Sequence, residues 1–192
     1  MKPQPSLLLQ PATRPRGAAL IISLVILVVI TLLGVASLRN VVLEEKMVTN
    51  YYDRSLAFQA AEAGLRAGEA LALAQSQQIP PHPIAMTLTT PTSASQCSSS
   101  CNGGVCSAPG QYCHERWNMS GFTGWVNLTG TTLTAQAGSA PQYFIEFLGS
   151  NFPCDPTDPV NNLSCTRYRV TARSNAGDGR AVVMLQSVYA TQ

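Results

Sequence analysis

The chain has 192 residues, enough for one modest domain and an accessory segment, and only 11% of them are charged, against about a quarter in soluble domains. The formal net charge is +2, but Lys2, Arg14 and Arg16 all precede a long apolar run, so nine basic and ten acidic residues follow and leave −1. No basic patch remains, which argues against a nucleic-acid-binding protein.

The first predicted element is an apolar helix. The run Ala18–Leu38, AALIISLVILVVITLLGVASL, holds 21 residues without a charge. As a helix it is about 30 Å long, which matches a bilayer core, whereas the apolar part of a secretory signal usually has about 7–15 residues. The basic residues before the run predict a cytoplasmic N-terminus. The alternative is a secretory signal cut after the small-x-small site Val35-Ala36-Ser37.

The helix is expected to continue beyond the apolar run. No proline occurs from Arg39 to Gln78, the segment is rich in Ala, Leu, Glu and Arg, and Pro80-Pro81 then ends the pattern. Glu62 and Arg66 form an i,i+4 pair in the favourable order. Apolar residues step by three or four along one predicted packing face, at Leu56, Ala60, Ala63, Ala67, Ala70 and Ala74.

A cysteine-containing, loop-rich region is predicted next. The stretch PPHP leads into a Ser/Thr-rich segment over residues 87–100. All six cysteines follow the apolar run, which indicates an oxidising compartment and disulfide bonds that hold a segment too polar to form its own core. Proximity favours Cys154 with Cys165 and two bonds, of open pairing, among Cys97, Cys101, Cys106 and Cys113. The alternative for these four, with His114, is a zinc site, although paired Cys-x2-Cys units are absent.

Strand signals appear late in the chain. QYFIEFLG (142–149) is aromatic and β-branched, and TRYRVTARS (166–174) alternates, with Tyr168, Val170 and Ala172 on one face. AGDG (176–179) predicts a turn before the returning strand 180–190, and GWVN (124–127) predicts a fourth strand. These signals predict an antiparallel sheet with the helix on its apolar side, an α+β fold.

No catalytic chemistry emerges from the sequence. His82 and His114 lack a nearby acid and nucleophile in a recognisable motif, and no phosphate-binding, dinucleotide-binding or His-Glu-x-x-His pattern occurs. Asp155 and Asp158, between the last two cysteines, are read as turn residues, with a calcium site as the alternative. We therefore expect no enzyme, no cofactor and no resident metal.

Two segments carry a family resemblance. RGAALIISLVILVVITLLGVASLRN and LEEKMVTNYYDRSLAFQAAEAGLRAGEA, over residues 16–70, resemble the N-terminal region of the PilX minor pilins of type IV pili. YRVTARSNAGDGRAVVMLQSVYA (168–190) is similar to the same family, while residues 80–138 match no family pattern. The resemblance implies a pilin-like fold, in which the long N-terminal helix packs on a small antiparallel sheet with disulfide-bonded loops.

The resemblance also implies specific processing. A prepilin peptidase would cut between Gly17 and Ala18 on the cytoplasmic face, and Ala18 would become the methylated amino terminus. Typical pilins carry a glutamate at the fifth mature position, where it pairs with the amino terminus of a neighbour. Here that position is Ile22. PilX-like minor pilins lack the same glutamate, which suits a subunit that need not dock beneath an earlier one.

The resemblance implies five segments: a leader over 1–17, a membrane or fibre-core helix over 18–38, a periplasmic helix over 39–79, a loop-rich region over 80–140 and a sheet over 141–192. The implied role is initiation and assembly of type IV pili in a priming complex at the fibre tip, which supports twitching motility and adhesion. The implied location is the inner membrane, with a periplasmic C-terminal domain, and then the surface pilus.

The implied partners are other minor pilins, the major pilin, the prepilin peptidase, the inner-membrane assembly machinery, a tip adhesin and the lipid bilayer. Two alternatives remain open. One is the tip pseudopilin of type II secretion, which shares the missing glutamate but is usually larger. The other is an unprocessed, membrane-anchored binding domain with a single span.

Overall fold

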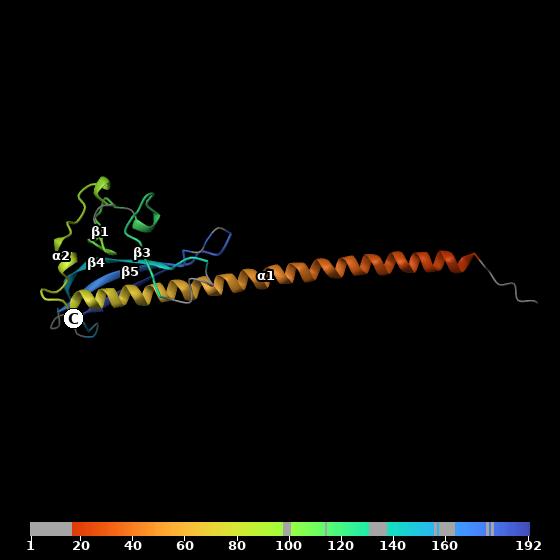
Figure 1. The fold of residues 1–192 in the computed structure, drawn as a ribbon, viewed down its shortest axis with the longest axis horizontal. Helices are drawn as coiled ribbons and strands as arrows, with labels where there is room; N and C mark the ends of the chain where they lie inside the picture. The colour runs from red at the N-terminus through yellow and green to blue at the C-terminus, as the bar shows by residue number, and fades with distance from the viewer. Residues whose placement is uncertain are drawn as a thin grey trace, which may run out of the picture. The chain divides into compact units, whose positions relative to one another are not determined.

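The computed structural model describes residues 17–97, 101–113, 115–130, 138–155, 157, 164–175, 177 and 179–192. The chain divides into two compact units, one up to Val48 and one from Thr49 onward. In the first unit, the described residues are almost entirely helical. The second unit contains the end of the same helix and a small sheet (Figure 1).

Helix α1 runs from Ala18 to Ser76, close to the predicted bounds. Its end has a local cause. Prolines at 80, 81 and 83 lack the N–H that a further turn needs and clash with the preceding turn. The last described bond of the helical pattern joins the Gln77 N–H to the Leu73 carbonyl at 3.2 Å. Within the helix, Glu62 and Arg66 form the expected ion pair at 2.7 Å.

Among its described residues, the second unit adds one short α-helix, two 3₁₀ turns and six strands. The helical pieces are α2 (Pro83–Thr87), η1 (Ala94–Gln96) and η2 (Arg116–Asn118). The strands are β1 (Cys101–Asn102), β2 (Val105–Cys106), β3 (Val126–Asn127), β4 (Gln142–Phe152), β5 (Cys165–Arg173) and β6 (Met184–Thr191). All four strands expected from the sequence are present. Of the expected turn 176–179, residues 176 and 178 lie outside the described residues.

The sheet order is β1-β2-β4-β5-β6, and β3 also pairs with β4. The α+β fold, with a long N-terminal helix on a small sheet and disulfide-bonded loops, is confirmed. One point differs from the expected antiparallel sheet, because β2 runs parallel to β4 through the pairs Val105–Ile145 and Cys106–Glu146. A long connection separates these two strands, so no tight hairpin forces them to be antiparallel.

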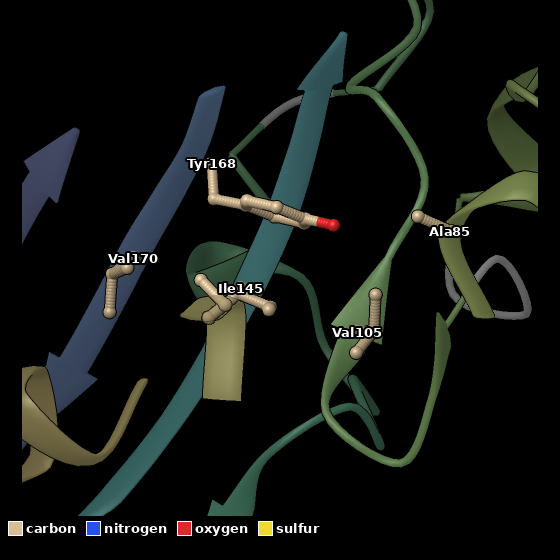
Figure 2. Close-up of a cluster of buried hydrophobic side chains, with 6 residues drawn as sticks. Ala85, Val105, Ile145, Tyr168 and Val170 are labelled. Carbon is tan, nitrogen blue, oxygen red and sulfur yellow. The ribbon is translucent and has the colours of Figure 1, made fainter. Parts of the chain in front are cut away.

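One face of the sheet packs against the second half of α1 (Figure 1). Tyr168, Val170 and Ala172 of β5 are fully buried, as their alternation predicts. The buried core cluster consists of Ala72, Ala85, Val105, Ile145, Tyr168 and Val170. Figure 2 shows the Tyr168 ring extending from β5 across β4 toward Ala85 of α2.

The opposite face of β4 and β5 is covered by the cysteine-containing region. Phe144 of β4 is fully buried, and the rings of Phe122 and Trp125 meet it edge-on at 4.9 and 4.8 Å between centroids. Thr171 of β5, on this same face, is also fully buried. The aromatic side chains of this region thus share a core with the sheet, and the region does not depend on its disulfide bonds alone.

Candidate functional site

The predicted cleavage junction lies where α1 begins. Gly17 is the residue directly before the helix and Ala18 is its first residue, and both are exposed. A Cβ atom built on Gly17 meets nothing within 4 Å among the described residues. The fold itself therefore does not require glycine at this position. Arg16 and the rest of the leader lie outside the described residues.

The first part of α1 carries an uninterrupted apolar surface. Ile22 is 58% exposed, and its large apolar neighbours are exposed to a similar degree. The hydroxyl groups of Ser23, Thr31 and Ser37 donate to backbone carbonyls of their own helix at 2.8–3.0 Å, so they present no unpaired donor to lipid. Among the described residues, α1 is the one helix long and apolar enough to cross a membrane.

The second part of α1 packs on the sheet through small residues. Gly64 and Gly68 are buried, and a Cβ on Gly68 would collide with Val170. The buried stripe comprises Leu56, Ala57, Ala60, Ala61, Gly64, Gly68, Ala72 and Gln75. The predicted stripe is correct at Leu56 and Ala60 but then follows the wrong side, since Ala70 and Ala74 are exposed. It omitted glycine, although glycine allows the closest approach of a helix to a sheet.

Two polar contacts join this part of the helix to the sequence at and before β6. Arg180 pairs with Asp53 at 2.9 Å, and both side chains are about a quarter to a third exposed. Ser187 donates to Glu69 at 2.9 Å. These contacts tie β6 and the residues just before it to α1.

The six cysteines form three disulfides: Cys97–Cys113, Cys101–Cys106 and Cys154–Cys165. The last pair is the one that sequence proximity favours. The other two resolve a pairing that the sequence leaves open. Disulfide sulfurs are not thiolate ligands, so this pairing removes the zinc alternative. His114 lies outside the described residues.

A buried ion cluster behind the sheet was missed by the sequence interpretation. Glu146 of β4 accepts from the Nη1 of Arg116 at 2.5 Å and from the Nε of Arg169 at 2.6 Å. The side chains of Glu146 and Arg116 are fully buried. Arg116 also donates to the Ser107 carbonyl at 2.9 Å and to the Ser107 hydroxyl at 3.2 Å. The cluster thus ties the cysteine-containing region to the sheet.

A second buried polar pair closes the end of the core. The Tyr168 hydroxyl lies 2.7 Å from Nδ1 of His82, directly before α2. Burial lowers the pKa of His82 below its usual 6.5 and raises the pKa of Tyr168 above 10. Both groups are therefore neutral at pH 7. This is a structural use of a histidine for which the sequence interpretation had assigned no role.

The candidate calcium residues are only partly described. Asp155 accepts from the backbone N–H and the hydroxyl of Thr157 at 2.8 and 2.6 Å, which lowers the pKa of its carboxyl group. Asp158 lies outside the described residues. Across the part of the chain that the structure describes, no group of three or more His, Cys, Asp or Glu side chains could hold a metal ion. The Asp155 geometry is that of a turn residue.

Comparison with known proteins identifies the family. Residues 16–66 match the model "PilX N-terminal", and residues 86–191 match the model "Type IV pilus assembly protein PilX C-term". The second match includes the cysteine-containing region, for which the sequence interpretation found no family pattern. No curated protein and no solved structure gives a match. The chain therefore belongs to the PilX family of type IV pilus assembly proteins, a structural family of minor pilins with an apolar N-terminal helix.

Proposed function

We propose that this minor pilin is a subunit of the priming complex that initiates a type IV pilus and then remains at the fibre tip. Prepilin peptidase cuts between Gly17 and Ala18, and Ala18 becomes the methylated amino terminus. Two features support the cut: a glycine that the fold itself does not need, and an apolar helix that begins at the next residue. The helix is then retained as the membrane anchor and later as part of the fibre core.

The observation that carries the tip position is Ile22. In typical pilins a glutamate at this fifth mature position pairs with the amino terminus of a neighbouring subunit. An ionised carboxylate in a bilayer costs about 2.5–3.5 kcal/mol on insertion scales, so it is kept where it has a partner. Ile22 is apolar and 58% exposed, and it cannot make this pair. The subunit still offers its own Ala18 amine to the subunit below, which suits the first position of a fibre.

The proposed topology follows from the same helix. The leader 1–17 is cytoplasmic, residues 18–38 span the inner membrane, and the helix 39–79, the loop-rich region 80–140 and the sheet 141–192 are periplasmic. Disulfides formed by all six cysteines support an oxidising compartment for these later segments. After assembly the same segments are displayed on the cell-surface pilus.

The proposed partners are other minor pilins and the major pilin, the prepilin peptidase, the inner-membrane assembly machinery and a tip adhesin. Through them the subunit supports twitching motility and adhesion. The alternative of a type II secretion tip pseudopilin is disfavoured by the match to pilus-assembly models over residues 16–66 and 86–191. The amino terminus distinguishes the remaining alternative, because an unprocessed single-span binding domain would keep Met1 whereas a processed pilin would begin at Ala18.

A deletion strain and immunogold labelling test the tip role. Deletion should abolish surface pili and twitching while the major pilin is still made. In complemented cells, the label should appear at fibre ends and in the inner membrane. Uniform labelling along the shaft, or normal piliation of the deletion strain, would contradict the priming role.

A further inference from the structure

Strand β6 forms an open edge of the sheet. Among the described strands it is last in the order, and it pairs with β5 alone, over all eight residues and without a register shift. Among the described residues, no other backbone hydrogen bond reaches Met184–Thr191. Every second residue of such an edge directs an unpaired N–H and C=O outward.

The edge lacks the usual protection against strand pairing. Natural edge strands are commonly blunted by lysine, proline, bulges or short length. The β6 sequence MLQSVYAT has no charge and no proline. Val188 is 62% exposed and Met184 is 38% exposed, both on the sheet face opposite α1. The strand is therefore regular and mainly apolar, and no described strand pairs with its outer side.

A groove lies beside the start of this edge. It has a volume of about 690 Å³ and is lined on one side by α1 residues that include Arg54 and Phe58, and on the other by Val183, Met184 and Leu185. Glu62, at the same groove, is paired with Arg66. Arg54 is exposed and has no ion-pair partner among the described residues. The groove thus offers apolar walls and one available cation.

The direction of β6 disfavours antiparallel pairing with β6 of a second copy of this chain. Along the helix, Gly64 faces Ala172 and Gly68 faces Val170, so β5 runs opposite to α1 and β6 runs with it. Antiparallel pairing of β6 with β6 of a second copy would turn that copy's domain upside down. Two subunits anchored in one membrane by the same end of the chain do not meet in that way.

We propose that β6 is a docking edge for an extended, mainly apolar segment of another pilus subunit, which adds a strand to the sheet and places a carboxylate against Arg54. Main-chain hydrogen bonds along Met184–Thr191 provide the binding, and the groove selects the flanking side chains. This inference rests on the proposed function for the class of partner, since it names a contact within the pilus tip.

Site-specific photo-crosslinking in piliated cells tests the proposal with the full chain. A photoreactive residue at Val188 should crosslink to a different pilus subunit, and mass spectrometry should map the adduct to an extended segment with an Asp or Glu nearby. The same probe at Tyr112, an exposed residue of the disulfide-bonded region, should give at least about tenfold less of this product. A crosslink to a second copy, or equal products at both positions, would overturn the proposal.

Substitutions test whether the crosslink depends on the β6 edge or on other parts of the subunit. Val188→Lys should reduce the crosslink from a probe at Gln186 about tenfold, because a lysine on the edge opposes strand addition. Arg54→Glu should reduce it several-fold through charge repulsion, whereas Tyr112→Lys should leave it unchanged. Met184→Lys provides a second edge variant if Val188→Lys fails to reach the membrane. An undiminished crosslink in the edge variants would refute strand addition.

Failure of the docking proposal can be told apart from failure of the proposed tip function. Label at fibre ends without the edge crosslink would overturn the docking edge and leave the tip role intact. The edge crosslink with label along the shaft would do the reverse.

Discussion

The buried ion cluster gives the sharpest stability prediction. Both carboxylate oxygens of Glu146 accept from guanidinium groups, one from Arg116 at 2.5 Å and one from Arg169 at 2.6 Å. In Glu146→Gln one of these oxygens becomes an NH₂ group, which is a donor and cannot accept. One guanidinium then faces a donor, and the charge of the fully buried Arg116 loses its counter-charge.

The expected loss in the free energy of unfolding is large for a single isosteric substitution. Removing one partner from a buried ion pair typically costs about 3–5 kcal/mol, because the remaining charge stays buried without compensation. For a unit the size of residues 49–192, each kcal/mol lowers Tm by about 3–4 °C, so the expected loss is about 10–20 °C. A matched control is Glu62→Gln, since Glu62 pairs with Arg66 at the surface. That exposed pair is worth about 0.2–0.5 kcal/mol, so Tm should fall by no more than about 2 °C.

The assay is thermal unfolding of the full chain in detergent, followed by tryptophan fluorescence. Trp117 and Trp125 report on the affected face, since Trp117 lies under Arg169 at 5.7 Å and Trp125 meets the Phe144 ring. A Glu146→Gln shift no larger than that of Glu62→Gln would refute the reasoning. The double variant Arg116→Met with Glu146→Leu should recover part of the loss, because it leaves neither buried charge without a partner.

Three further predictions follow from other parts of the chain. Gly68→Ala should destabilise the second unit, because overpacking against Val170 costs about 1–3 kcal/mol and the gain in helix propensity returns only about 0.5–1 kcal/mol. The control Gly34→Ala, whose added Cβ meets nothing, should leave the Tm of the second unit unchanged. The pKa of His82 is lowered in the folded protein, so on acidification the unfolded chain binds a proton at a higher pH than the folded chain does, and stability should fall as pH drops below about 6.5. The drop in Tm between about pH 7.5 and about pH 5.5 should be smaller in His82→Gln than in the unmodified protein, and an equal drop would contradict the assignment. Gly17→Val should leave an unprocessed membrane precursor on immunoblots, whereas Gly34→Val, the same change inside α1, should be cut normally; equal processing of both would contradict cleavage after Gly17.

Local signals in the sequence were sufficient for much of the fold. The length of the apolar run and the proline cluster after Gln78 define α1 to within two residues. The strict alternation at Tyr168, Val170 and Ala172 correctly predicts the buried face of β5. Each of these signals depends on neighbouring residues alone, so no knowledge of distant contacts was needed.

The features that the sequence could not predict depend on distant partners. Arg116 and Glu146 are 30 residues apart, and each alone resembles an ordinary surface charge. The pairing of the first four cysteines depends on where β1 and β2 meet. The buried stripe of α1 was predicted on the wrong side because Gly64 and Gly68 have no apolar side chain to mark it, although their close approach to β5 positions the helix.

The amino terminus of the mature protein tests the central claim most directly. The chain should be recovered from sheared pili and its N-terminal peptide analysed by mass spectrometry. The account predicts a peptide that begins at Ala18 and carries an N-methyl group, with the apolar helix retained. A chain that still begins at Met1, or one that begins after Ser37, would contradict the account.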